Sequence, residues 1–211
     1  MLPKVSNPFI IGFGSSLTKV LAVNNYPTAE RFERLRSCII ENGIDVITTN
    51  WNESLVAKFN DFEGVILSGS PDMMSRKDTQ EKFRREAEAV LDARVPILGV
   101  CFGHQLIAHA FGSSVVADAE NVLRFVKTAI LLDDPLFSGL PREVSLLESR
   151  HEIVKALPEE FEKLAASETS PIAAMRHRKR TLYGVQFHPE RYTAGSPAGK
   201  FVVRNFLGLL Q

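Results

Sequence analysis

The first half of the chain alternates short, mostly apolar runs with segments that have the hydrophobic period of a helix. The apolar runs cover residues 19–23, 45–49, 64–68 and 96–100. A strand that is apolar on both of its faces is typical of a parallel sheet buried between two layers of helices. The alternation therefore predicts an α/β fold with a mostly parallel central sheet and helices on both faces.

Helical segments separate these runs. We expect one helix from Thr28 to about Asn42, ended by Gly43, and another over about residues 79–93. Shorter helices are expected at residues 54–59 and 102–111. The apolar stripe of the first helix consists of Phe32, Leu35, Cys38 and Ile39, and that of the second consists of Phe83, Ala87, Val90 and Leu91.

The second half of the chain has a different pattern. Strand-like runs at residues 126–132, 144–147, 172–175 and 182–187 are joined by turn-rich connections. We therefore expect a small antiparallel extension beside the parallel sheet, followed by a last helix over about residues 198–210.

Length and charge restrict the class of protein. With 211 residues and 45% hydrophobic content, the chain suits a single domain over residues 19–211, preceded by an N-terminal extension at residues 1–18. The 25 basic residues balance the 25 acidic ones, which argues against a nucleic-acid partner. The apolar stretch at residues 9–13 is too short to span a membrane, so no membrane partner is expected.

The cysteines and histidines give no sign of a structural or metal framework. Two cysteines, Cys38 and Cys101, do not make a disulfide scaffold and favour a reducing, cytoplasmic setting. The spacing of the five histidines does not match a metal site. No phosphate-binding glycine motif is present either, so we expect neither a metal nor a cofactor.

The segment Gly99-Val100-Cys101-Phe102-Gly103 has the form of a nucleophile elbow, with a cysteine where a serine is more usual. Such an elbow turns sharply from a strand into a helix, and small residues two before and two after the nucleophile relieve the crowding. It exposes the sulfur at the carboxyl end of the sheet and directs the Phe102 N–H at an oxyanion. Cys101 is therefore predicted to be a nucleophile, whereas Cys38 is predicted to be a buried apolar residue.

A nucleophilic thiol needs a base, and that base needs a group that orients its ring. His188-Pro189-Glu190 follows an apolar run, and residues two apart in a strand face the same side. Glu190 is therefore predicted to orient His188, whose other ring nitrogen faces Cys101. His104 lies on the elbow helix and is expected to point elsewhere, either packing in the core or supporting a residue that contacts the substrate.

Two segments together resemble a known family. Gly99 to Ala108 (GVCFGHQLIA) and Gly184 to Glu190 (GVQFHPE) strongly resemble the class I, or triad, glutamine amidotransferases. The resemblance implies the flavodoxin-like class I glutaminase fold and L-glutamine as the substrate. It also implies a Cys101 thioester that releases ammonia and then glutamate, with Cys101, His188 and Glu190 as the catalytic triad.

The resemblance implies further residues of the pocket. Gly69 and Ser70 match a loop that completes the oxyanion hole with Phe102, and Gln105 matches a substrate-contacting glutamine. The loop at residues 148–152 implies that Ser149 holds the substrate backbone. This chain departs from the family with Ser70 where glycine is usual, and with Arg150 at a histidine position, so that His151 is displaced by one residue.

Residues 157–175 and 204–207 further resemble the glutaminase subunit or domain of GMP synthase. That resemblance implies that the partner receiving the ammonia is a synthetase (ATP-pyrophosphatase) subunit. Arg191 and Val122 depart from it and leave open a stand-alone γ-glutamyl peptidase. A catalytically silent binding or regulatory module is a third alternative, against which the intact triad argues.

Overall fold

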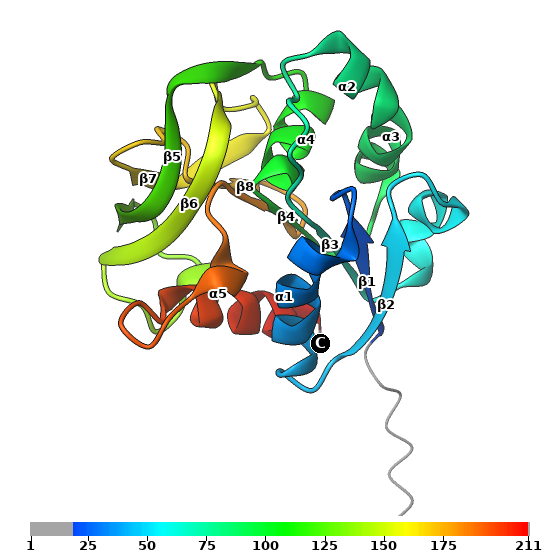
Figure 1. Cartoon of the computed structure of the whole chain (residues 1–211). Helices are drawn as coiled ribbons and strands as arrows, with labels where there is room; N and C mark the ends of the chain where they lie inside the picture. The colour runs from blue at the N-terminus through cyan, green and yellow to red at the C-terminus, as the bar shows by residue number, and fades with distance from the viewer. Residues whose placement is uncertain (1–18, 211) are drawn as a thin grey trace, which may run out of the picture.

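The computed structural model describes residues 19–210, so the predicted extension at residues 1–18 lies outside the described part. One sheet of nine strands runs through the molecule (Figure 1). Its order is β2 (Asp45–Asn50), β1 (Lys19–Asn24), β3 (Gly64–Leu67), β4 (Ile97–Val100), β9 (Leu182–Val185), β8 (Ala174–His177), β7 (Phe161–Ser167), β5 (Val115–Ile130) and β6 (Glu143–Val154).

The sheet has two halves. The first five strands in that order pair in parallel, and the last four pair antiparallel from β9 onward. The parallel half has the 2-1-3-4-5 order of flavodoxin-like folds, in which ligands bind beyond the carboxyl ends of the strands. The predicted α/β architecture with an antiparallel extension is thus the one observed, and the extension holds four strands.

Helices cover both faces of the parallel half. One face packs against α1 (Ala29–Ile40) and α5 (Ala198–Leu207), and the other against α3 (Arg84–Asp92) and α4 (Phe102–Ala110). Helix α2 (Lys77–Lys82) leads into α3, and short 3-10 turns lie at Ser54–Asp61, Pro135–Phe137, Pro189–Arg191 and Gly208–Leu210. Each face buries its own hydrophobic cluster, because adjacent strand residues point to opposite faces.

Two local predictions need correction. The helix expected at residues 79–93 is broken at Phe83, and its buried stripe includes Glu86 while Leu91 is 45% exposed. Strand β7 was not predicted, because its sequence FEKLAAS places charged residues between apolar ones. The stripe of α1 is buried as predicted, and Gly43 follows it with a φ of 77°.

The antiparallel half brings β6 beside the end of β9. The Leu147 carbonyl accepts a hydrogen bond of 2.8 Å from the His188 N–H, although the two residues are far apart in sequence. This contact places one edge of the antiparallel half next to the carboxyl ends of β4 and β9 (Figure 1). Within residues 19–210, none of the helices has the length and apolar character needed to cross a lipid bilayer.

Candidate active site

The turn between β4 and α4 holds Cys101 in a strained conformation. Its φ is 52° and its ψ is −100°, and within residues 19–210 it is the only non-glycine residue with a positive φ. Such a conformation costs on the order of 1–3 kcal/mol and persists only where the surrounding structure enforces it. The Cys101 N–H donates to the Val185 carbonyl at 2.8 Å, which ties the turn to β9.

The two glycines of this turn are required by close backbone approach. A Cβ atom on Gly99 would lie 2.5 Å from the carbonyl group of Gly103, and a Cβ on Gly103 would lie 2.6 Å from the Leu67 carbonyl oxygen. Neither contact can be relieved by a side-chain rotation, because the opposing atoms belong to the backbone. The elbow predicted from the glycine spacing is therefore present, and its cause is steric.

His188 and Glu190 form a buried pair beside the elbow. The Nδ1 atom of His188 lies 2.8 Å from Oε1 of Glu190, and both side chains are 4% exposed. The pairing agrees with the sequence prediction, but the reason given for it was wrong. β9 ends at Val185, and Glu190 reaches the ring from the 3-10 turn Pro189–Arg191 rather than by strand alternation.

The two buried histidines near Cys101 have opposite electrostatic surroundings. Burial disfavours a charged His188, but the neighbouring charges of Glu190 and Cys101 outweigh burial and raise the pKa of His188 to about 10. Burial lowers the pKa of His104 to about 3, so its ring stays neutral. His104 packs against Gly184, where a Cβ would lie 2.5 Å from the His104 Nδ1.

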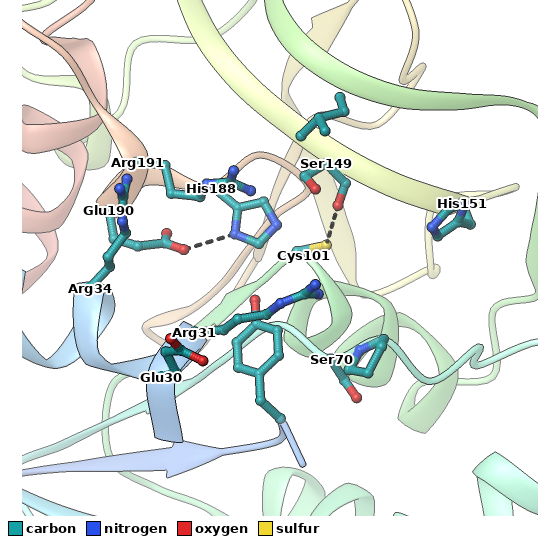
Figure 2. Close-up of a pocket in the computed structure, with 13 residues that line it drawn as sticks. Glu30, Arg31, Arg34, Ser70, Cys101, Ser149, His151, His188, Glu190 and Arg191 are labelled. Atoms are coloured by element: carbon teal, nitrogen blue, oxygen red, sulfur yellow. Dashed lines mark hydrogen bonds and ion pairs between the residues drawn. The ribbon is translucent and has the colours of Figure 1, made fainter. Parts of the chain in front are cut away.

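Neighbours from β6 and β9 surround the sulfur. The Ser149 carbonyl oxygen lies 3.5 Å from the Cys101 Sγ (Figure 2), and Nε2 of Gln186 lies 3.8 Å from the same sulfur. The Gln105 amide donates to Oε1 of Gln186 at 3.3 Å and to the Glu152 carbonyl at 3.0 Å. Gln105 is thus buried and contacts Gln186, whose amide nitrogen in turn lies next to the Cys101 sulfur. No role was predicted for Gln186 from the sequence.

A cavity of about 380 Å³ opens over the sulfur. Figure 2 shows Cys101 and His188 at its inner end, with Ser70, Ser149 and His151 along one side. The rest of the lining comes from Tyr26, Glu30, Arg31, Arg34, Pro71, Leu123, Glu190 and Arg191. Arg31, Arg34 and Arg191 outnumber the two glutamates, so the lining has a surplus of positive charge. Neither Tyr26 nor the arginines of α1 were predicted from the sequence as part of the site.

The loop after β3 lies directly against this cavity. A Cβ on Gly69 would lie 2.3 Å from the Tyr26 hydroxyl and 3.1 Å from Cε1 of His188, so a larger residue there would require the Tyr26 side chain to move. Ser70 does not have a positive φ, and its hydroxyl accepts a hydrogen bond of 3.1 Å from the Asp72 N–H. Phe102 begins α4, so its N–H has no acceptor within that helix.

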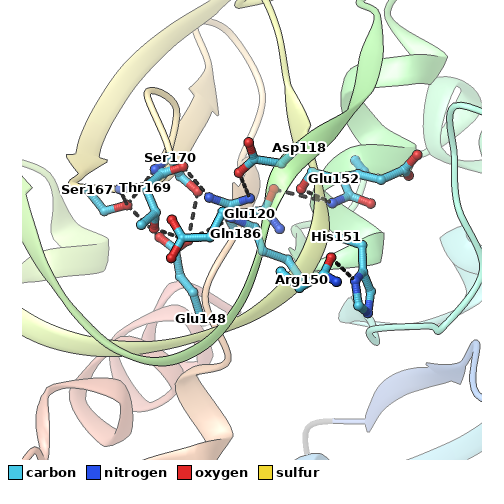
Figure 3. A network of polar contacts seen from close by, with 12 residues as sticks. Asp118, Glu120, Glu148, Arg150, His151, Glu152, Ser167, Thr169, Ser170 and Gln186 are labelled. Carbon is cyan, nitrogen blue, oxygen red and sulfur yellow. Dashed lines mark hydrogen bonds and ion pairs between the residues drawn. The ribbon is translucent and has the colours of Figure 1, made fainter.

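Strand β6 explains the two unusual residues at positions 150 and 151. Its residues alternate between faces, so His151 faces the cavity and lies 2.6 Å from Asn121, whereas Arg150 points the other way and is wholly buried. Arg150 binds Glu148 at 2.8 Å and Asp118 at 2.6 Å, and also donates to the Thr169 carbonyl (Figure 3). The position at which the family usually has a histidine therefore holds an arginine, and its contacts with Glu148, Asp118 and Thr169 form a brace that fixes β6.

Glu148 completes this brace. Its two carboxylate oxygens accept hydrogen bonds from the hydroxyls of Ser167, Thr169 and Ser170 as well as from Arg150 (Figure 3). A buried carboxylate is stable only when its oxygens are satisfied in this way. Among residues 19–210, no cluster of three or more histidine, cysteine, aspartate or glutamate side chains could hold a metal ion.

Residues 23–209 match the family model for class-I glutamine amidotransferases. The chain is 40% identical over 156 residues to a glutamine-hydrolyzing GMP synthase subunit of Archaeoglobus fulgidus, covering 74% of this chain and 80% of that one. It is 42% identical over 146 residues to the corresponding subunit of Pyrococcus abyssi, covering 69% and 74%.

Solved structures agree with these matches. A Thermoplasma acidophilum protein provisionally assigned as a GMP synthase subunit superposes with a TM-score of 0.81 at 27% identity, covering 92% of this chain and 94% of that one. A glutamine amidotransferase from Thermotoga maritima superposes with a TM-score of 0.75 at 16% identity, covering 92% and 97%. These likenesses confirm the predicted flavodoxin-like class I glutaminase fold.

Proposed function

Because this chain belongs to the class I glutamine amidotransferase family, we propose that it hydrolyses the side-chain amide of L-glutamine through a thioester on Cys101. The observation that supports this proposal most strongly is the strained turn at Cys101, which holds the sulfur beside a buried His188–Glu190 pair. A strained nucleophile next to an oriented base is the arrangement that acyl transfer requires. The same pair argues against a catalytically silent module.

His188 moves the protons in this mechanism. Its Nδ1 faces Glu190, so Nε2 is the nitrogen that takes the proton of the Cys101 thiol. The thiolate then attacks the amide carbon of glutamine, and a C–S bond forms as the carbonyl π electrons move onto oxygen. The Glu190 carboxylate stabilises the imidazolium that results, in agreement with the raised pKa of His188.

Backbone N–H groups are proposed to stabilise the oxyanion. The Phe102 N–H, which begins α4, and the N–H groups of the Gly69–Ser70 loop are the candidate donors. When the oxyanion collapses, the C–N bond breaks, and His188 gives its proton to the leaving nitrogen, which departs as ammonia. His188 then takes a proton from water, and the hydroxide attacks the thioester carbon. The tetrahedral intermediate collapses with cleavage of the C–S bond, which releases glutamate, and the Cys101 thiolate takes the proton back from His188.

The charged lining of the cavity is proposed to bind the α-groups of the substrate. Arg31 points into the cavity near Cys101 in Figure 2, and Glu30 lies beside it on the first turn of α1. An arginine matches a carboxylate and a glutamate matches an ammonium group. Together they would hold the zwitterionic end of glutamine while its amide reaches the sulfur.

We further propose that the ammonia goes to a synthetase subunit that aminates xanthosine monophosphate, as in GMP synthase. The support is the identity of about 40% with relatives named as glutamine-hydrolyzing subunits of that enzyme. The test is to mix the chain with an ATP-pyrophosphatase subunit, xanthosine monophosphate and ATP, and to measure glutamate and GMP together. Equal formation of the two, lost in Cys101→Ala, is the expected result.

Two other outcomes separate the alternatives. Rapid cleavage of γ-glutamyl peptides by the isolated chain, without any stimulation by the synthetase, would favour a stand-alone γ-glutamyl peptidase. Unchanged glutamate release in Cys101→Ala would exclude the thioester mechanism.

A further inference from the structure

Two buried oxygen atoms on neighbouring side chains lack hydrogen-bond partners. Glu86 lies in α3 and is 1% exposed, and Asn25 lies just after β1 and is also 1% exposed. The Asn25 amide nitrogen donates to Oε1 of Glu86 at 3.0 Å. The second oxygen of each group, Oε2 of Glu86 and Oδ1 of Asn25, has no partner among residues 19–210.

A single proton on the Glu86 carboxyl would give both unpaired oxygen atoms a hydrogen-bond partner. An ionised carboxylate and an amide oxygen are acceptors only, so neither can satisfy the other. If Oε2 of Glu86 carries a proton, it becomes a donor, and Oδ1 of Asn25 is the unsatisfied acceptor on the same partner. Buried polar groups are nearly always paired, so the protonated form is the one that this packing favours.

No positive charge compensates an ionised Glu86. The elements packed against α3 are the 3-10 turn Ser54–Asp61, α2 and α4. None of the ionisable side chains on these elements or on α3 itself shifts the pKa of Glu86. These side chains are Lys58, Asp61, Lys77, Asp78, Glu81, Lys82, Arg84, Arg85, Glu88, Asp92, His104 and His109. Burial alone raises the pKa of Glu86 from 4.5 to about 8, and the hydrogen bond from Asn25 opposes burial only in part.

Asn25 connects Glu86 to the loop beside Cys101. The Asn25 N–H donates to the Ser68 hydroxyl at 2.9 Å, and its amide nitrogen lies 3.4 Å from the Ser68 carbonyl. The Ser68 hydroxyl donates to the Gly69 carbonyl at 2.9 Å. The Ser68 carbonyl also accepts from the Gly103 N–H of the elbow at 3.2 Å. A displaced Asn25 would therefore move the loop and the elbow together.

We propose that Glu86 is a neutral carboxylic acid which donates to Asn25 and so positions the Ser68–Ser70 loop beside Cys101. Glu86 does not touch the cavity, so it is a positioning residue that acts through Asn25 and Ser68. Its effect on catalysis rests on the glutaminase function proposed above. Its protonation state does not, and each can be measured separately.

The first test measures stability against pH in wild type and Glu86→Gln. A glutamine has the shape of the protonated acid and can donate to Oδ1 of Asn25 at every pH. In wild type, the raised pKa gives stability that is fully present below pH 4.5 and lost as pH rises to about 8. The melting temperature of Glu86→Gln minus that of wild type should therefore increase from about pH 5 to about pH 8 and then level off.

Glu88→Gln is the matched control. Glu88 lies on the same helix, but its side chain is 55% exposed and pairs with Arg84 in solvent. We expect its melting curve to run parallel to that of wild type over the whole pH range. Infrared spectroscopy gives an independent measure, because a buried protonated carboxyl has a C=O band that Glu86→Gln lacks and Glu88→Gln keeps.

The second test measures glutamine hydrolysis. Glu86→Gln should keep the wild-type kcat near neutral pH and should exceed wild type above about pH 8, where Glu86 ionises in the folded enzyme. Glu86→Ala should lower kcat on the order of ten- to a hundred-fold, as small misplacements at an active site do, with a smaller change in KM. Rescue by glutamine but not by alanine distinguishes positioning from a loss of bulk packing.

Three results would overturn the proposal. The first is a Glu86→Gln curve that runs parallel to wild type at every pH. The second is the absence of the carboxyl band in wild type below about pH 8. The third is failure of Glu86→Gln to fold while Glu88→Gln folds, since an isostere of the neutral acid should be tolerated. If the chain did not hydrolyse glutamine, the melting curves and the infrared band would still decide whether Glu86 is neutral.

Discussion

The two halves of the sheet contribute to the same cavity in different ways. The parallel half supplies reactive side chains: Cys101 follows β4, and His188 and Glu190 follow β9. The antiparallel half supplies backbone, because β6 offers the Ser149 carbonyl to the sulfur and the Leu147 carbonyl to the His188 N–H. Substitutions in the first half should therefore alter chemistry, and those in β6 should matter only when they move the strand.

The largest effect is expected for Cys101→Ala. Removing the nucleophile of a triad costs on the order of 10⁴-fold or more in kcat, and glutamate release by the purified variant should fall at least that far. Ser149→Gly, in the opposite half, leaves the carbonyl in place and serves as the comparison. If Cys101→Ala kept one-tenth of the wild-type activity, the proposal that the parallel half supplies the reactive side chains would be wrong.

Glu190→Gln should have the next largest effect. The ring of His188 would lose the carboxylate that stabilises its charge, and kcat should fall on the order of 10²- to 10⁴-fold. The charges of Glu190 and Cys101 outweigh burial in raising the pKa of His188 from 6.5 to about 10. Protonated His188 thus adds stability that is fully present below pH 6.5 and lost as pH rises through about 10.

That dependence should shift in the variant. Without the Glu190 charge, the loss of stability should move to lower pH, which thermal melts from about pH 6 to about pH 10 would detect. Glu41→Gln, an exposed substitution in a neighbouring segment, should leave the pH profile unchanged. A Glu190→Gln profile identical to wild type would mean that Glu190 does not control the charge of His188.

Arg150→Met probes the brace that holds β6. Removing one partner of a buried ion pair costs about 3–5 kcal/mol of stability, because the wholly buried Glu148 would be left without its arginine partner. Arg142→Met is the matched control, since its pair with Asp133 is exposed and should contribute less than about 1 kcal/mol. Urea denaturation of both variants measures the difference.

The reason for the loss can be checked separately. Replacing Glu148 and Arg150 together by apolar residues should recover part of the lost stability, because no unpaired charge remains. An Arg150→Met variant as stable as wild type would show that the hydroxyls around Glu148 are sufficient without the arginine.

The sequence predicted the parallel half well because its signals are local. The sharp turn at Cys101 follows from five consecutive residues, because a side chain on Gly99 would meet the backbone of Gly103 within the same segment. The apolar strands and the stripe of α1 likewise follow from their own periods. Local steric crowding and hydrophobic periodicity can be predicted directly from a single sequence.

The parts that sequence reasoning missed depend on distant partners. Glu86 was not part of the predicted buried stripe, and its burial depends on a hydrogen bond from Asn25, which is distant in the sequence. Arg150 was identified from the sequence only as a departure from a histidine position, and its burial depends on its pairs with Glu148 and Asp118. The contact between Glu190 and His188 was predicted for a wrong reason, because residues Pro189–Arg191 form a 3-10 turn rather than an extended strand.

The smallest effect is expected for Ser149→Ala, and it tests the comparison most directly. The sulfur contacts the carbonyl oxygen of Ser149 and not its hydroxyl, so kcat/KM for glutamine should change by less than about threefold, within the range of substitutions that remove no specific contact. Steady-state glutaminase assays on wild type and variant give the value. A loss above about tenfold would mean that the hydroxyl binds the substrate, since that factor corresponds to about 1.4 kcal/mol, the size of a hydrogen bond. In that case the antiparallel half would supply side-chain chemistry as well, and the division between the two halves would no longer hold.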